Sequence, residues 1–123
     1  MGRTYFLPWP ISANARMGVV NGRQILTTMA RKWYAHAAEE LMVQRPKAVK
    51  GPVEIDIKLV PPNKRRFDID NKAKTTLDAL VKSLIIEDDD CSIVKKLTLS
   101  LDGVRDKPGA YVTVSPKATE KGV

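Results

Sequence analysis

Two aspartates in the middle of the chain, Asp68 and Asp70, stand two residues apart. In an extended segment, side chains at positions i and i+2 point to the same side, ~6.5–7 Å apart. Two carboxylates at that spacing can converge on one divalent cation, and oxygen ligands favour Mg²⁺ or Mn²⁺ over softer metals. The pair therefore indicates a metal site, although Asp70 or Asn71 could instead cap the helix that we expect to follow.

A lysine and a second acidic cluster accompany this pair. Lys74 follows Asp70 by one helical turn, so it lies on the same side and could stabilise charge that develops on a phosphate. It also precedes Asp78 by four residues and could pair with that carboxylate instead. The acidic run 87–90 follows the expected helix and could return to the same place. A solvated turn is the alternative interpretation of this run.

Basic residues directly precede the acidic pair, in a chain with a formal net charge of +7 and a pI of about 9.7. Such a balance favours nucleic acid as a partner. Lys64, Arg65 and Arg66 could contact backbone phosphates, which gives affinity without sequence information. A charged loop without such a role is the alternative.

The N-terminal segment adds weaker candidates for contacts with DNA. Asn14 and Arg16 lie in an expected polar loop over residues 12–18. Trp9 stands between two prolines, where it could stack on a base or pack near the edge of a sheet. A single histidine, His36, excludes a two-histidine zinc site and disfavours histidine-centred catalysis.

Length and composition limit the class of protein. A chain of 123 residues fits one domain, and 43% hydrophobic residues allow a real core. The single cysteine, Cys91, excludes a disulfide framework and fits the reducing cytoplasm. No apolar run approaches the ~18 residues of a membrane span, so we expect no membrane association.

The hydrophobic pattern predicts the elements that position these residues. We expect an α/β (α+β) domain over residues 1–123, with a mixed sheet of four to six strands, two main helices packed on it and a flexible tail from about 116. The Asn-Gly pair at 21–22 predicts a hairpin. One helix is expected to follow a cap at Thr27 or Thr28 and to run to about 45, with Ala30, Tyr34, Ala37 and Leu41 facing inward. Another is expected to carry Ala73, Leu77, Leu80, Val81 and Leu84 on one face. Strands are expected at 4–7, 53–59, 97–101 and 111–115.

The order of basic run, Asp-x-Asp-Asn, lysine one turn on, helix and acidic block resembles the RusA family of Holliday junction resolvases, small endonucleases of bacteria and phages. The core of the resemblance is the segment 65–74, with the Asp-Asp motif in 89–93. The segment 77–80 resembles the helix that follows the core, and 7–14 resembles the Pro-Trp-Pro and Ser-x-Asn part of the family.

This resemblance implies a cytoplasmic homodimer that nicks two opposed strands of a four-way DNA junction with Mg²⁺ or Mn²⁺. The essential acids of the family carry over to Asp68, Asp70 and one acid of the downstream pair, and its essential lysine carries over to Lys74. Placing Ile93 at the apolar position after the motif selects Asp90 as the third acid, with Asp89 as the second choice.

The chain departs from the family pattern in three places, and three other functions compete with this expectation. One departure is that the run 87–90 offers three aspartates, which leaves the third acid ambiguous. One competing function is a structural or interaction domain, in which this run is a solvated turn. Phe67 stands where a further basic residue is common, and the segment 83–86 replaces one that usually contains glycine. A non-enzymatic nucleic-acid-binding module would explain the basic run but not the acids, which repel phosphates unless a metal neutralises them. A nuclease for other branched DNA, such as flaps, would share the whole site.

Overall fold

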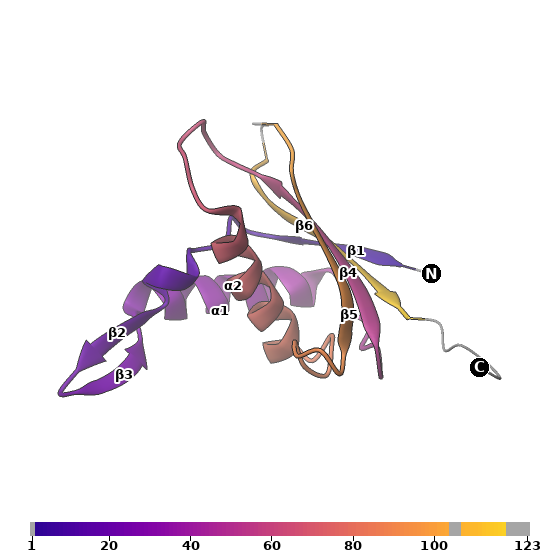
Figure 1. The fold of residues 1–123 in the computed structure, drawn as a ribbon, viewed down its shortest axis with the longest axis horizontal. Helices are drawn as coiled ribbons and strands as arrows, with labels where there is room; N and C mark the ends of the chain where they lie inside the picture. The colour runs from indigo at the N-terminus through magenta and orange to yellow at the C-terminus, as the bar shows by residue number, and fades with distance from the viewer. Residues whose placement is uncertain (1, 104–106, 118–123) are drawn as a thin grey trace.

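The structure, a computed structural model, describes residues 2–103 and 107–117. It contains a four-stranded sheet, a separate two-stranded hairpin, one short 3₁₀ turn and two helices (Figure 1). In chain order the elements are β1 (Arg3–Leu7), η1 (Ala13–Ala15), β2 (Met17–Val20), β3 (Arg23–Leu26), α1 (Thr28–Val43), β4 (Val53–Val60), α2 (Ile69–Lys82), β5 (Val94–Leu101) and β6 (Gly109–Pro116).

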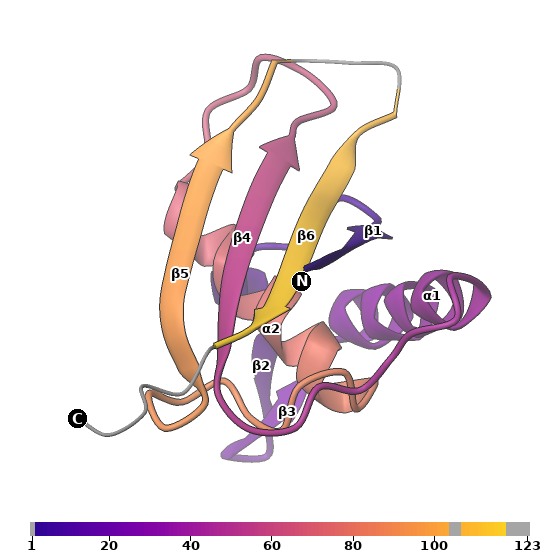
Figure 2. The same ribbon diagram turned by 90° about the vertical axis from the view of Figure 1, so that its right-hand side faces the viewer.

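The main sheet has the strand order β1-β6-β4-β5 (Figure 2). Strands β4 and β5 are parallel, because helix α2 carries the chain back between them, whereas β6 is antiparallel to both β1 and β4. The sheet is therefore mixed, as the sequence predicts. Each strand expected from the hydrophobic alternation is present, and β6 begins two residues earlier than predicted, at Gly109.

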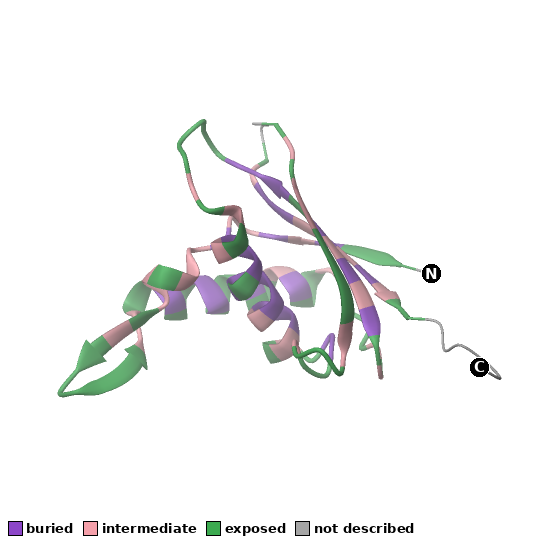
Figure 3. Ribbon diagram, in the orientation of Figure 1, coloured by how far each residue is buried: buried purple, intermediate pink, exposed green. Residues whose placement is uncertain are grey.

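Both helices lie on one face of the sheet, and the core forms between the helices and the sheet (Figures 1 and 3). Strand β4 shows why, since Val53, Ile55, Ile57 and Leu59 are at most 1% exposed while the residues between them are partly or fully accessible. The face of α1 predicted to point inward is confirmed. Its buried residues are Ala30, Tyr34, Ala37 and Leu41, together with Trp33, which the prediction omitted.

The hairpin β2–β3 extends away from the sheet (Figure 1). Asn21 and Gly22 both have positive φ angles, 53° and 75°, which is the backbone of the turn that the Asn-Gly pair predicts. Thr27 then caps α1, because its side chain accepts a hydrogen bond from the backbone N–H of Ala30 at 3.1 Å. The hydroxyl of Thr27 also donates to the carbonyl of Ala15 at 2.9 Å, which ties the preceding loop to the start of the helix.

The end of α2 differs from the prediction. Ala73, Leu77 and Leu80 are buried as expected, but Leu84 is 77% exposed. The reason is that the helix ends at Lys82 and Leu84 adopts a positive φ of 60°, so the helical periodicity no longer applies to it. The segment that follows instead buries Ile85 and Ile86.

Strand β5 lies at the edge of the sheet, and this explains its exposed leucines. Leu97 and Leu101 pair in register with buried residues of β4, yet they are 43% and 58% exposed. Beyond β6, Lys117 pairs with Glu54 at 3.4 Å, and the rest of the predicted flexible tail, residues 118–123, lies outside the described residues. Within the described ranges, no helix is long and apolar enough to cross a bilayer.

Candidate metal and DNA site

The loop between β4 and α2 presents the basic run to solvent. Pro61 and Pro62 end the strand, and the side-chain oxygen of Asn63 accepts a hydrogen bond from the backbone N–H of Arg65 at 2.9 Å. This turn leaves the three basic side chains exposed. They border an open depression of about 670 Å³, which is lined by Lys64, Arg65, Arg66, Phe67, Asp68, Ile69 and Leu101.

The acidic pair lies at the start of α2, and its geometry differs from the one predicted. The helix begins at Ile69, so Asp68 is extended but Asp70 is already in the first helical turn. Asp68 occupies the N-cap position, where the sequence had suggested Asp70 or Asn71, and its carboxylate makes no capping hydrogen bond. Both aspartates are exposed, and neither has a side-chain hydrogen bond or ion pair within the described residues.

Lys74 lies one turn further along α2 and stands between two carboxylates. Its Nζ atom is 3.9 Å from Oδ1 of Asp78 and 3.5 Å from Oδ2 of Asp89. The lysine side chain is 48% exposed, whereas those of Asp78 and Asp89 are 17% and 23% exposed. The acidic run at the end of the helix therefore does return to the helix face that carries Asp70 and Lys74.

Asp90 has a different environment from Asp89. Its carboxylate accepts hydrogen bonds from the backbone N–H and the hydroxyl of Ser92, and these bonds hold the pKa of Asp90 below its usual value. Asp90 is therefore ionised at neutral pH, is exposed, and has no cationic partner among the described residues. Of the two candidates for the third acid, the structure places Asp89 beside Lys74 and leaves Asp90 at the turn.

The described residues contain no group of three or more acidic, histidine or cysteine side chains arranged to hold a metal ion. The convergence of Asp68, Asp70 and Asp90 on one cation therefore stays a prediction. The donor chemistry fits a hard divalent cation, because Asp68 and Asp70 offer carboxylate oxygens that no cation in residues 2–103 and 107–117 neutralises. These oxygens adjoin a basic loop that can hold a polyanion.

Arg16, one of the two N-terminal candidates, is engaged within the protein. Its guanidinium pairs with the carboxylate of Asp78, which also accepts a hydrogen bond from the hydroxyl of Tyr34 at 3.0 Å. Burial, together with the charge of Asp78, raises the pKa of Tyr34 to about 12, so this hydroxyl remains a donor. Asn14 is exposed on the neighbouring 3₁₀ turn. Contact of either residue with DNA stays a prediction.

Lys72 is a residue that sequence reasoning missed. It is only 9% exposed, and its Nζ atom donates a hydrogen bond to the carbonyl of Pro10 at 2.8 Å. The ammonium lies 5.0 Å from the ring centre of Trp9 and 5.7 Å from that of Phe67. Burial lowers the pKa of Lys72. A lysine in the first turn of an amphipathic helix usually faces water, so nothing in the local pattern indicates this position.

Comparison with known proteins identifies the family. The family model described as endodeoxyribonuclease RusA matches residues 8–115. This chain belongs to the RusA family. The crossover junction endodeoxyribonuclease RusA of Aquifex aeolicus (strain VF5) is 32% identical over 103 residues, which are 80% of this chain and 81% of that relative.

The RusA match includes the whole candidate site. The matched residues 8–115 contain the basic loop, the acidic pair, Lys74 and both candidates for the third acid. They also contain Asn14 and Arg16. The family resemblance predicted from segments 65–74 and 89–93 is therefore confirmed.

Proposed function

We propose that this protein is an endodeoxyribonuclease that resolves four-way (Holliday) DNA junctions by paired nicks in opposed strands. The observation that carries this proposal is the match to the RusA family over residues 8–115. It is supported by the position of two unneutralised carboxylates, Asp68 and Asp70, between an exposed basic loop and Lys74. As an enzyme acting on chromosomal or phage DNA, it would work in the bacterial cytoplasm.

We further propose Mg²⁺, or Mn²⁺, as the cofactor, held by Asp68, Asp70 and Asp90. A divalent cation in such a site supplies an activated water and neutralises charge on the phosphate oxygens. The carboxylates of Asp68 and Asp70 are exposed at the start of α2. They can bind the cation there without breaking an ion pair to any described residue. Asp90 is chosen over Asp89 because Asp89 already contacts a cation, Lys74, at 3.5 Å.

In this proposal the ammonium of Lys74 faces the scissile phosphate. Its contacts with Asp78 and Asp89 hold the side chain on the face of α2 that carries Asp70. A positive charge fixed in advance near the phosphate stabilises the extra negative charge of the transition state at little reorganisation cost. Lys74 thus has a catalytic role, and Asp89 is a positioning residue that acts through it.

Lys64, Arg65 and Arg66 would bind the DNA backbone beside this site. All three are exposed along the depression that reaches Asp68. Phosphate contacts of this kind fix the register of the DNA without reading its sequence. Selectivity for branched DNA would then come from the shape of the junction and from the spacing between the two active sites of a dimer.

We propose a homodimer, because resolution needs two nicks on one junction. Strand β5 is an edge strand, and its exposed Leu97 and Leu101 are of the kind that a second protomer would cover. Sedimentation equilibrium measures the mass directly. A dimeric mass is expected, and a monomer at micromolar concentration, with and without junction DNA, would contradict this part of the proposal.

A comparison of substrates tests the proposed function. The protein is incubated in Mg²⁺ with a four-way junction, a 5′ flap and a linear duplex of the same sequence. Preferential cleavage of the junction supports a resolvase. Preferential cleavage of the flap indicates a different branched-DNA nuclease, and binding without cleavage of any substrate indicates a non-enzymatic module.

A further inference from the structure

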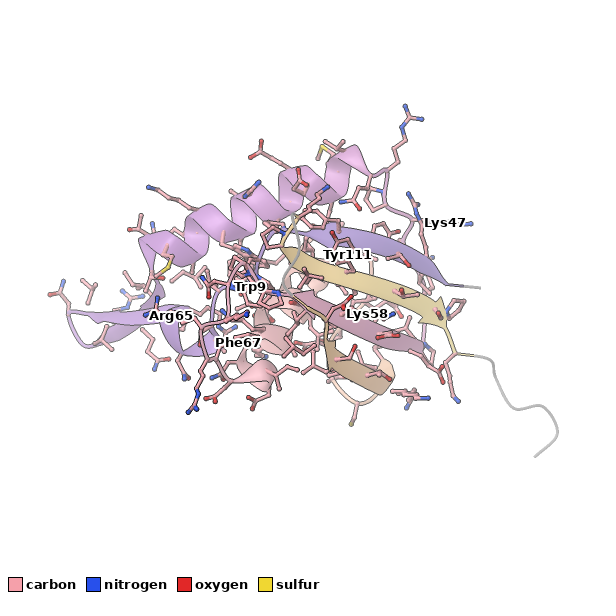
Figure 4. The ribbon with its side chains drawn as sticks, turned by 90° about the horizontal axis from the view of Figure 1, so that it is seen from above. Trp9, Lys47, Lys58, Arg65, Phe67 and Tyr111 are labelled. Atoms are coloured by element: carbon pink, nitrogen blue, oxygen red, sulfur yellow. The ribbon has the colours of Figure 1, made fainter. Side chains whose placement is uncertain are left out.

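A second pocket, of about 390 Å³, is lined in part by the same basic loop. It shares Arg65, Arg66 and Phe67 with the depression at Asp68, so the two hollows adjoin. Figure 4 shows Trp9, Arg65 and Phe67 in the same part of the molecule. We call it the aromatic pocket. Its lining residues are Trp9, Pro61, Pro62, Asn63, Arg65, Arg66, Phe67 and Lys72.

The walls of the aromatic pocket are fixed in place by interactions within the protein. Trp9 and Phe67 meet edge to face, with ring centres 5.1 Å apart and an interplanar angle of 85°. The buried ammonium of Lys72 lies against both rings and is itself held by the carbonyl of Pro10. Pro61 and Pro62 restrict the backbone opposite. A ligand would therefore meet rings that are already oriented.

Part of each ring remains available to a ligand. Trp9 and Phe67 are only half-buried, although both pack against the core. If their sole purpose were to fill the core, they would not line an open pocket beside two exposed arginines. Lys72 has no acidic partner among the described residues, so the pocket carries a positive charge in addition to Arg65 and Arg66.

The chemistry of this lining fits a nucleobase attached to its phosphate backbone. Aromatic faces stack on any base, and cations beside them bind the flanking phosphates. Asn63 adds a polar group to the pocket. Its side-chain oxygen accepts a hydrogen bond from the backbone N–H of Arg65, and its amide nitrogen remains a donor for a ligand. A pocket for phosphate alone would not need two aromatic rings.

We propose that the aromatic pocket receives one unstacked nucleobase of the DNA strand whose phosphates lie on Lys64, Arg65 and Arg66. This proposal rests on the DNA binding in the proposed function and adds a contact to a base beside the cleavage site. Bases at a branch point are the easiest to unstack, because one stacking neighbour is already lost. The pocket thus contributes to the choice of the position that is cut.

Tryptophan fluorescence tests the proposal directly, since the chain has two tryptophans, Trp9 and Trp33. Trp33 is buried in the core, 7% exposed, and packs against Tyr34. The variant Trp33→Phe leaves Trp9 as the only tryptophan, and Trp9→Phe leaves Trp33 as a matched control. Each is titrated with a four-way junction in EDTA, which prevents cleavage, while a gel shift measures binding independently.

The proposal predicts strong quenching in the Trp33→Phe variant, where Trp9 stacks on a base, and little change in Trp9→Phe. If the gel shift shows binding but the fluorescence of Trp9 is not quenched, base binding in the aromatic pocket is wrong, whereas the proposed nuclease function is unaffected. No junction binding by the unaltered protein overturns both proposals, so the two failures are distinguishable.

A second measurement does not need the Trp33→Phe variant, so the proposal can still be tested if that variant does not fold. Junctions carry 2-aminopurine at each position around the crossover in turn, and the fluorescence of this base reports its stacking. One position should change its signal with the natural chain and not with Trp9→Ala. Trp9→Ala should also bind about 5- to 100-fold more weakly, the effect expected for one lost base–aromatic stack. Equal signals and equal affinities for the two proteins overturn the proposal.

Discussion

At the scale of single residues, the protein neutralises some carboxylates of the site and leaves others without a cationic partner. Asp78 and Asp89 are engaged with cations, whereas Asp68 and Asp70 have no such partner in the part of the chain that the structure describes. Two negative charges beside the basic loop that we propose to bind phosphates would weaken DNA binding unless a cation joined them. This difference in neutralisation separates the proposed ligands from the positioning residues.

Asp70→Asn should abolish cleavage and preserve junction binding. The change is nearly isosteric and removes one negative charge that faces the DNA, so affinity should hold or rise while the metal is lost. Cleavage and gel-shift assays measure the two effects separately. Glu39→Gln removes an exposed charge from α1 and serves as the control. Loss of binding in a folded Asp70→Asn variant would indicate a structural role for Asp70 instead.

Lys74→Ala should slow the chemical step by about 100-fold or more, the scale seen when a transition-state charge stabiliser is removed. Binding should weaken far less. Single-turnover cleavage at saturating enzyme isolates the chemical step. Lys82→Ala changes an exposed lysine of the same helix and is the matched control. A Lys74→Ala variant that binds weakly yet cuts at the normal rate once saturated would reduce Lys74 to a phosphate contact.

Asp89→Asn and Asp90→Asn should have different effects. Asp90→Asn removes a proposed ligand, so the Mg²⁺ concentration needed for half-maximal cleavage should rise. Asp89→Asn removes a 3.5 Å contact that positions Lys74, so the cleavage rate should fall. The Mg²⁺ concentration needed for half-maximal cleavage should stay unchanged. Mg²⁺ titrations of single-turnover rates distinguish the two. The reverse pattern would assign Asp89 as the ligand.

Among the site residues, positions that depend on local spacing could be predicted from sequence. Lys74 follows from its four-residue distance to Asp70, and that helical geometry is confirmed. Contacts between distant segments could not be predicted. Arg16 reaches Asp78 across 62 residues, and Lys72 reaches Pro10 across the same separation. No local pattern encodes either contact.

At the scale of elements, short-range signals succeeded and helix ends did not. The predictions of a hairpin at the Asn-Gly pair and of a strand at β4 are confirmed, because each depends only on neighbouring residues. Leu84 was assigned to the buried face of α2 because its spacing continues the helical pattern, whereas the chain leaves the helix after Lys82. The parallel pairing of β4 with β5 depends on packing over the whole sheet and was not specified in advance.

Thr27→Ala should destabilise the fold by about 1 kcal/mol, the usual cost of losing an N-cap side chain. Its hydroxyl oxygen accepts from the N–H of Ala30 at 3.1 Å and also links α1 to Ala15. Thr28→Ala alters the adjacent exposed threonine, which does not cap the helix, and is the matched control. Urea unfolding of both variants measures the difference. Equal stabilities would show that the cap contributes nothing.

At the scale of the whole molecule, basic residues lie at both ends of the sheet. The basic loop follows β4 at one end, and Lys117 lies beside Pro52, before β4, at the other. In the proposed function, DNA binds at the end where the basic loop adjoins Asp68. The net charge of +7 alone would not specify this orientation.

Arg65→Ala should weaken junction binding about equally for all sequences and lower the salt slope by roughly one unit, because one phosphate contact is lost. Lys117→Ala removes a positive charge at the opposite end of the sheet, where it pairs with Glu54, and should leave the slope unchanged. Dissociation constants over a range of salt concentrations give both slopes. Equal slopes for the two variants would contradict the proposed position of the DNA.

The central claim is paired, metal-dependent nicking of a four-way junction. The most direct measurement uses a synthetic mobile junction with each strand labelled in turn, with and without Mg²⁺, and maps every nick. The account predicts symmetric nicks in two opposed strands with Mg²⁺, and intact DNA when EDTA replaces the metal or when Asp70→Asn replaces the natural chain. Junctions that are bound yet remain uncut in Mg²⁺ and in Mn²⁺, or nicks unaffected by EDTA, would contradict it.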